Sequence, residues 1–134
     1  MASRILLDKG VKEYCAAAKL IRDQEILDVD FQLAGPIDEL SPSSISLQEI
    51  SLICEESGVN YLGNRTDINK LLASASIFVF PSYYPEGVPK VLLEAAACGT
   101  PIITTDHPGC KDAVIESETC LLYTSPSPRD KRQS

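Results

Sequence analysis

The residues that could do chemistry gather in one stretch, from Phe80 to Thr105. It carries Glu86 in a loop of Pro and Gly residues and, after seven further residues, Glu94 in an apolar segment with helical spacing. Pro89 stands where the first helical turn would begin, a position that does not need its missing N–H group. The loop is therefore expected to bring Glu86 to the N-terminus of a helix, which is a place where anions bind.

The elements around this stretch alternate between strand and helix. Apolar residues at helical spacing predict helices over residues 11–22, 47–57, 68–75 and 88–98. Short apolar or alternating runs predict strands over residues 29–34, 59–62, 77–80 and 101–105, and residues 1–7 read as the end of another strand. This order predicts an α/β fold in one domain, a doubly wound parallel sheet of the Rossmann-like kind.

Local signals fix one helix and the edge where a ligand would bind. Ser46, followed by Glu49, predicts a capping box at the start of the 47–57 helix, and Gly58 is suited to end it. Ligands of doubly wound sheets bind outside the carboxyl ends of the strands. Residues from five separate loops fall near those ends: Arg4, Gly35, Gly63, Glu86 and Asp106.

Composition limits the classes of function. The 134 residues suffice for one domain, and a formal net charge of -7 with scattered Lys and Arg residues argues against a nucleic-acid partner. The five cysteines form no CxxC motif and have no His at metal spacing, which favours free thiols in a reducing compartment. The sequence shows neither a signal peptide nor an apolar run of membrane-spanning length. We therefore expect a cytoplasmic protein.

Two blocks of sequence together resemble a known family. EGVPKVLLEAAACGTPIITT, with Glu86 and Glu94, is similar to the signature of retaining family-4 glycosyltransferases of the GT-B fold. SRILLDKG matches the other half of that pattern, an Arg (Arg4) and a Lys (Lys9) five positions apart, and FQLAG and GNRTDI match the blocks between. The resemblance covers residues 1–119. SYYPEGVPKVLLEAAA and TTDHPGC look most like bacterial enzymes that build lipopolysaccharide, capsule or other surface glycans.

The resemblance implies a role for each motif residue. Arg4 and Lys9 would neutralise the departing diphosphate of a nucleotide-sugar donor, so that no metal ion or other cofactor is needed. Glu86 would hold hydroxyls of the transferred sugar and stabilise positive charge on its ring, which completes the catalytic set. Glu94 would hold the ribose hydroxyls, because an ionised carboxylate accepts hydrogen bonds from a diol. The remaining donor-binding residues would be Gly63, Asn64 and Arg65 at the base, the amides of Gly87 and Val88, and Pro89 and Val91.

The same resemblance implies partners and a location. The chain would be the C-terminal, donor-binding domain of a hexosyltransferase whose N-terminal domain is missing, and alone it would be inactive. The acceptor would be a glycan or a lipid-linked sugar. The whole enzyme would be cytoplasmic or bound peripherally at the inner membrane.

The last fifteen residues, CLLYTSPSPRDKRQS, differ from the rest of the chain. They are rich in Ser, Pro and charge without periodicity, which predicts disorder. Residues 120–130 also resemble the in-frame translation of a transposon-end adaptor used to prepare sequencing libraries, and family members continue with Thr-Gly-Leu-Leu-Val where this chain has Thr-Cys-Leu-Leu-Tyr. We expect residues 1–119 to be a truncated domain and residues 120–134 a non-native disordered tail; a genuine flexible tail is the alternative.

Other functions fit parts of the pattern. A non-catalytic α/β module could use the same sheet edge to hold a ligand or partner, and nucleotide binding would discriminate between the two readings. Two carboxylates also serve hydrolytic glycosidases, but that chemistry does not call for phosphate-binding cations. A sugar-nucleotide epimerase of similar architecture is disfavoured because its acid and base residues are not apparent.

Overall fold

Parallel strands and helices alternate along the chain in the computed structural model, which describes residues 1–25, 28–83, 87–106, 110 and 120–123. The helices are a short 3-10 helix η1 (Leu7–Lys9), α1 (Val11–Asp23), α2 (Leu47–Ser57), α3 (Ile68–Ser74) and α4 (Lys90–Ala97). The strands are β1 (Phe31–Ala34), β2 (Val59–Gly63), β3 (Phe78–Phe80), β4 (Ile102–Thr105) and β5 (Cys120–Tyr123). The predicted α/β, Rossmann-like class is confirmed.

The first two α-helices form for reasons that the sequence displays. In α1, Val11, Tyr14 and Ala18 lie at helical spacing and are buried, so this face packs on the sheet. Helix α2 begins where the Ser46 hydroxyl accepts a hydrogen bond from the Glu49 amide at 3.1 Å. Its predicted capping box is only half formed, because the Glu49 side chain instead pairs with the Lys12 ammonium on α1 at 3.2 Å.

The strands pair in two separate ladders rather than in one continuous sheet. β1 pairs with β2, and β3, β4 and β5 pair in that order, with every pairing parallel. Residues 1–6 form no strand and make only isolated bridges, which join Ala2 to Ala34, Ile5 to Ile37 and Leu6 to Ser44. The strand expected over residues 1–7 is therefore reduced to a bridging segment, because Leu7 already begins η1.

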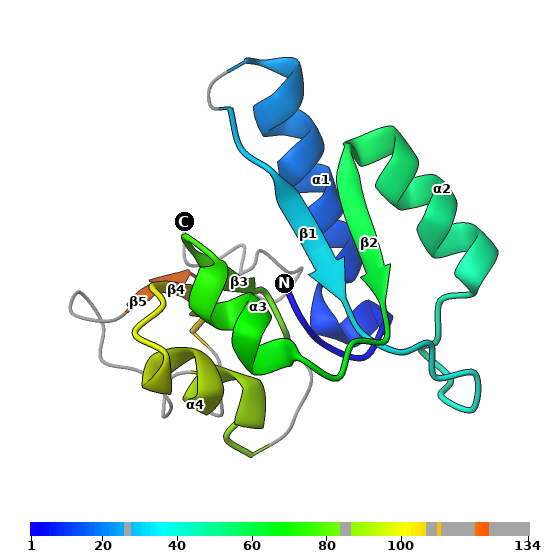
Figure 1. Cartoon of the computed structure of the whole chain (residues 1–134). Coiled ribbons are helices and arrows are strands. Elements are labelled where there is room, and N and C mark those ends of the chain that lie inside the picture. Colours follow the sequence, from blue (N-terminus) through cyan, green and yellow to red (C-terminus); the bar gives the residue numbers. More distant parts are fainter. Residues whose placement is uncertain (26–27, 84–86, 107–109, 111–119, 124–134) are drawn as a thin grey trace, which may run out of the picture.

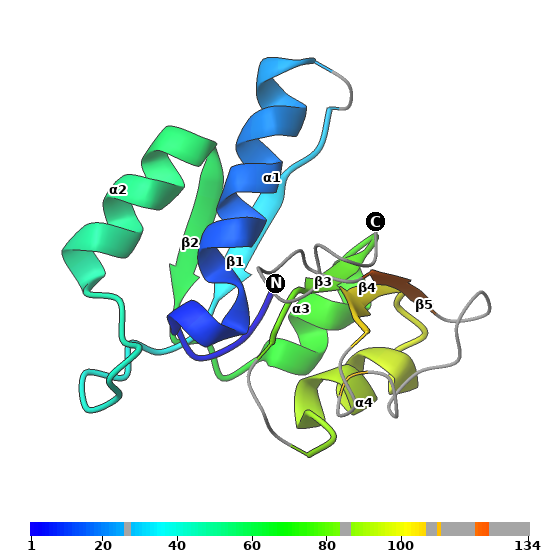
Figure 2. The ribbon, with the colours of Figure 1, turned by 180° about the vertical axis from the view of Figure 1, so that it is seen from behind.

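The two ladders lie in different parts of the ribbon (Figure 1), and the described residues form two hydrophobic clusters. One core joins α1 and α2 to β1 and β2, through buried residues such as Val11, Leu33 and Ile50. The other joins α3 and α4 to β3 and β4, through residues such as Phe80 and Leu92, and it also includes Ala34 at the end of β1. Helix α1 lies behind β1 in Figure 1 and in front of it in Figure 2, so it covers one face of that ladder.

The prediction of a disordered tail over residues 120–134 is wrong for its first four residues. Cys120–Tyr123 forms β5, which pairs in parallel with β4 from Ile102 to Thr105. Strand pairing uses main-chain groups, so the short apolar run CLLY can add to an edge whatever its origin. Residues 124–134 lie outside the described residues, and the resemblance to an adaptor stays an expectation.

Candidate functional site

A cavity of about 400 Å³ opens at the carboxyl-terminal ends of the strands. Among the described residues that line it, four are basic (Arg4, Lys9, Arg65 and Lys90) and one, Glu94, is acidic. This local balance is opposite to the net charge of -7 of the whole chain. The cavity is therefore suited to an anionic ligand that also offers hydroxyl groups to a carboxylate.

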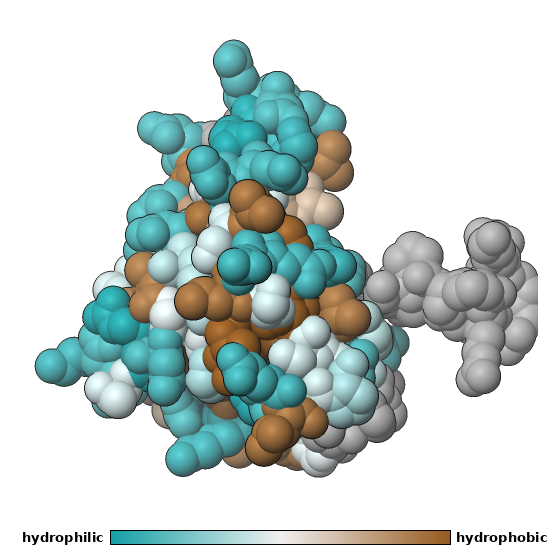
Figure 3. All heavy atoms as spheres, turned by 90° about the vertical axis from the view of Figure 1, so that its right-hand side faces the viewer, coloured by the Kyte–Doolittle hydropathy of each residue, from teal (hydrophilic) through white to brown (hydrophobic). Residues whose placement is uncertain are grey.

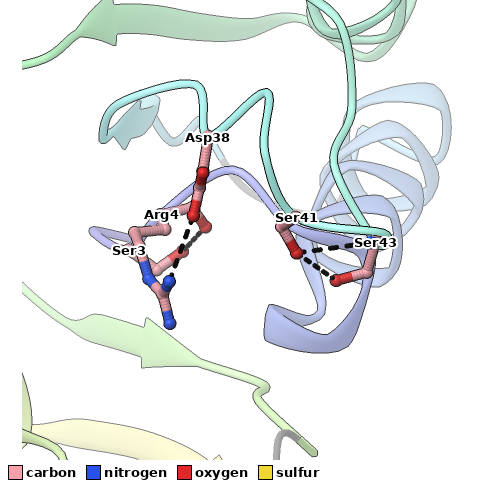
Figure 4. Close-up of polar contacts among 5 residues, drawn as sticks. All are labelled: Ser3, Arg4, Asp38, Ser41 and Ser43. Carbon is pink, nitrogen blue, oxygen red and sulfur yellow. Dashed lines mark hydrogen bonds and ion pairs between the residues drawn. The ribbon is translucent and has the colours of Figure 1, made fainter.

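Arg4 reaches the cavity from a segment whose main chain is fixed against β1. The amides of Ser3 and Ile5 donate to the carbonyls of Ala34 and Pro36, each at 3.0 Å. Gly35 permits this approach: it has φ +154°, and a Cβ there would lie 1.5 Å from the Ser3 carbonyl oxygen. The Arg4 side chain is 45% exposed, and its Nη1 lies 3.2 Å from the Asp38 carboxylate (Figure 4).

Lys9 lies deeper, with only 5% of the residue exposed. Its ammonium nitrogen is 5.8 Å from the centroid of the Phe80 ring, which is within the range of a cation–π contact. The Asp8 carbonyl next to it accepts a hydrogen bond from the Tyr83 amide at 3.0 Å. This bond ties η1 to the segment that follows β3, so Lys9 is held beside that segment.

Glu94 reaches the cavity from α4 on the other side. Its side chain is 35% exposed, and its carboxylate is 4.0 Å from the ammonium of the solvated Lys90. At the start of the helix, Pro89 accepts a hydrogen bond from the Leu92 amide at 3.1 Å. Pro89 (φ -65°, ψ 128°) is thus the N-cap and not the first helical residue.

The expected helix over residues 88–98 is corrected by this cap. Helix α4 starts at Lys90, because Pro89 has an extended ψ. Gly87 and Val88 therefore precede the helix, and neither is among the residues that line the cavity. Lys90 and Val91, the first two helical residues, do line it. Glu86 lies outside the described residues.

The turn after β2 forms the third side. Gly63 (φ +75°) lets the chain turn, and its carbonyl accepts a hydrogen bond from the Gly35 amide at 2.8 Å. Arg65 makes a two-pronged ion pair with Asp67, Nε to Oδ1 at 2.8 Å and Nη2 to Oδ2 at 2.7 Å. These hydrogen bonds hold the pKa of the Asp67 carboxyl below its usual value. The guanidinium is thereby fixed at the rim of the cavity.

The cavity brings together most of the predicted site residues, although they come from four parts of the chain. Those that line it are Arg4, Lys9, Asn64, Arg65, Pro89, Val91 and Glu94. Gly63, Gly87 and Val88 are not among the lining residues. The lining residues that were not predicted as site residues are Ala2, Ser3, Ala34, Gly35, Pro36, Ile68, Phe80 and Lys90. A signal existed for Gly35 and Phe80, which stand at the ends of predicted strands.

The described residues offer neither a cluster of metal ligands nor a membrane-spanning helix. Among them, no group of three or more His, Cys, Asp or Glu side chains is placed to hold a metal ion. No helix within that part of the chain has the length and apolar character needed to cross a bilayer.

The chain is similar to known proteins over nearly its whole length. Residues 1–131 match the family described as Glycosyl transferases group 1. A curated relative from Campylobacter jejuni, N,N'-diacetylbacillosaminyl-diphospho-undecaprenol alpha-1,3-N-acetylgalactosaminyltransferase, is 42% identical over 130 residues, which are 97% of this chain and 32% of that protein.

The chain is also similar to solved structures over nearly its whole length. HepE from Anabaena, in complex with UDP and glucose, is 25% identical with a TM-score of 0.72, over 91% of this chain and 33% of that one. Sucrose-phosphate synthase from Thermosynechococcus elongatus is 27% identical with a TM-score of 0.75, over 93% of this chain and 31% of that one. The chain thus spans about a third of the length of these relatives.

Proposed function

We propose a donor-binding role for this chain, which belongs to the Glycosyl transferases group 1 family. It is the C-terminal domain of a GT-B glycosyltransferase that works in the synthesis of bacterial surface polysaccharide or lipopolysaccharide, and the cavity holds a nucleotide-diphosphate sugar. One observation carries the proposal: Arg4 and Lys9 from the start of the chain and Glu94 from α4 line one cavity at the strand ends. Such a set offers cations to a diphosphate and a carboxylate to a diol.

The two cations act on the leaving group. In a retaining transfer, the bond between the sugar and the diphosphate breaks, and negative charge grows on the departing diphosphate. Cations placed on that charge stabilise the transition state more than the ground state. Arg4 offers a planar fork of N–H donors, and Lys9, which is buried beside Phe80, offers a charge little screened by water. In this proposal they do the work that a metal ion does in other transferases.

The other residues hold the rest of the donor. Glu94 accepts hydrogen bonds from the ribose hydroxyls, and the turn that carries Asn64 and Arg65 contacts the base. UDP in the related HepE structure supports UDP as the first nucleotide to test. We assign hydroxyls of the transferred sugar to Glu86, the motif glutamate ahead of α4.

The acceptor side belongs to the rest of the enzyme, and the donor-binding chain alone should not transfer sugar. The name of the Campylobacter relative supports a lipid-linked sugar as acceptor. Figure 3 shows hydrophobic residues gathered among hydrophilic ones on one face of the chain. Among the large apolar residues, Leu40 is 97% exposed and Leu52 is 60% exposed.

Titration of the chain with UDP, GDP and ADP tests the proposal. At least one diphosphate should bind at micromolar to millimolar concentration, measured by NMR shifts at fixed ionic strength. Arg4→Gln and Glu94→Ala should each weaken that binding about tenfold, the effect of losing one charge-assisted contact. Lys19→Ala is the matched control, because Lys19 is a surface cation on α1 paired with Asp23 and is remote from the cavity lining.

Failure of all three diphosphates to bind would contradict the proposal. If a folded sample binds none of the three diphosphates at millimolar concentration, donor binding is ruled out for this chain. A non-catalytic α/β module would then explain the fold.

A further inference from the structure

Asp38 holds the guanidinium of Arg4 at the mouth of the cavity. The carboxylate Oδ2 lies 3.2 Å from Nη1, and the two side chains are 29% and 45% exposed (Figure 4). Arg4 lines the cavity, whereas Asp38 is not among the lining residues. The Asp38 carboxylate thus contacts the guanidinium from outside the cavity lining.

The main chain on both sides of this pair is fixed. The Ile5 amide donates to the Pro36 carbonyl at 3.0 Å, and Ile5 and Ile37 form a parallel bridge. The Tyr61 hydroxyl donates to the Gly35 carbonyl at 2.7 Å. An exposed ion pair usually contributes little because two mobile side chains must be ordered. Here the backbones of both partners are already held in place, so the pair has only the rotamer freedom of the two side chains to restrict.

The loop beyond Asp38 is closed by its own hydrogen bonds. The Ser41 amide donates to the Asp38 carbonyl at 3.2 Å, and the Ser43 amide donates to the Ser41 hydroxyl at 3.3 Å. The hydroxyls of Ser41 and Ser43 lie 3.2 Å apart (Figure 4). The Ser43 carbonyl then accepts from the Leu7 amide at 2.9 Å, which returns the loop to the segment that carries Arg4. Asp38 is thus presented from a closed, anchored loop.

We propose that Asp38 is a positioning residue, which aims the Arg4 guanidinium at the diphosphate of the donor. This inference rests on the proposed function and deepens it. A guanidinium has five N–H donors in one plane, and Asp38 accepts the hydrogen bond from Nη1. A carboxylate that holds one edge of the guanidinium fixes the orientation of that plane, on which two-pronged contact with phosphate oxygens depends.

Two neutral variants isolate the positioning effect. Asp38→Asn and Asp38→Ala both remove the negative charge, but only Asn keeps an oxygen that can accept from Nη1. The probes are the tightest-binding of UDP, GDP and ADP and its free nucleoside, titrated into the whole chain at fixed ionic strength. The Ala variant should bind the diphosphate about threefold to tenfold more weakly than the Asn variant, as expected for one partly exposed charge-assisted hydrogen bond.

Two controls separate positioning from a purely structural role. The Ala-to-Asn ratio should fall to about one for the free nucleoside, which has no phosphate, and also when Arg4 is replaced by Ala. If the Ala variant does not fold, Asp38→Ser replaces it, since the serine oxygen is too short to reach Nη1. Thermal unfolding of each variant checks the fold.

The ratio of the diphosphate dissociation constants of the Ala and Asn variants decides the role of Asp38. A ratio near one for the diphosphate with Arg4 present overturns the role of Asp38, as does a ratio that persists without Arg4. If the wild-type chain binds none of the diphosphates, the proposed function itself has failed.

Discussion

Replacing Gly10 with alanine should push apart the two sides of the cavity. Gly10 follows Lys9 at the end of η1 and has φ +78°. A Cβ at this position would lie 2.2 Å from the Pro81 carbonyl oxygen and 2.8 Å from its carbonyl carbon. These are backbone atoms, so the strain cannot be relieved by turning a side chain. The contact joins the segment of Arg4 and Lys9 to the loop after β3.

The expected loss of stability has two parts. A residue other than glycine in the left-handed conformation costs about 1–2 kcal/mol. Forcing extra atoms into a packed contact adds about 1–3 kcal/mol, which gives a total of about 2–5 kcal/mol for Gly10→Ala. Gly99→Ala is a matched control, because Gly99 has nearly the same φ, +73°, and the described residues place nothing within 4 Å of its Cβ position. It should lose only the first part.

Urea unfolding of the two variants measures the difference. At equal m-values, the free energy of unfolding should be at least about 1 kcal/mol lower for Gly10→Ala than for Gly99→Ala. Diphosphate binding should be measured without urea, at a temperature where both variants are folded. It should weaken more for Gly10→Ala than for Gly99→Ala. Equal losses in the two variants would refute the claim that the approach of Gly10 to Pro81 holds the cavity together.

Three further predictions concern charge, capping and packing. Arg65→Ala should raise the pKa of Asp67 toward its ordinary value, because the Arg65 hydrogen bonds lower it. The ion pair stabilises the fold at pH values above the ordinary pKa of Asp, and this stabilisation is lost as the pH falls through the lowered pKa of Asp67 in the folded chain. A carboxyl 13C titration measures this, and an unchanged midpoint counts against the pairing. Ser46→Ala should lower the free energy of unfolding by about 1 kcal/mol through loss of the α2 cap, and a urea midpoint equal to wild type would contradict that role. Leu92→Ala, at a fully buried site, should lower it by about 2–5 kcal/mol; a loss below that of the cap variant would show that the α4 core is not packed as described.

Much of the fold was predictable because local signals decide it. Helix α2 begins and ends at the residues expected, since Ser46 supplies the cap and Gly58 (φ +74°) takes the left-handed end. The start of α4 was misplaced because proline suits two positions. Its fixed φ allows both the first helical residue and an N-cap, and only ψ, which the sequence does not restrict, distinguishes them.

The site residues that belong to the family motif could be predicted from the sequence. Arg4, Lys9 and Glu94 came from the family resemblance, and the structure brings all three to one cavity. Asp38 had no such signal, because its contact with Arg4 joins positions 34 residues apart and depends on how the chain continues beyond β1. The split between the two ladders was equally hidden, since it depends on hydrogen bonds between segments and not on the apolar pattern of either.

The cavity lies where the carboxyl ends of the two ladders meet. In doubly wound folds, ligands bind where the strand order reverses, outside the carboxyl ends of the strands. Here the segment of residues 1–6 bridges to β1, while Ala2 packs in the same core as Phe80 on β3. A donor that contacts Arg4 and Glu94 together would therefore connect the segment that bridges to β1 with helix α4 beside the other ladder. Binding free energy would then add to the contacts that hold the two ladders together, so the stability of the folded chain should rise with donor concentration.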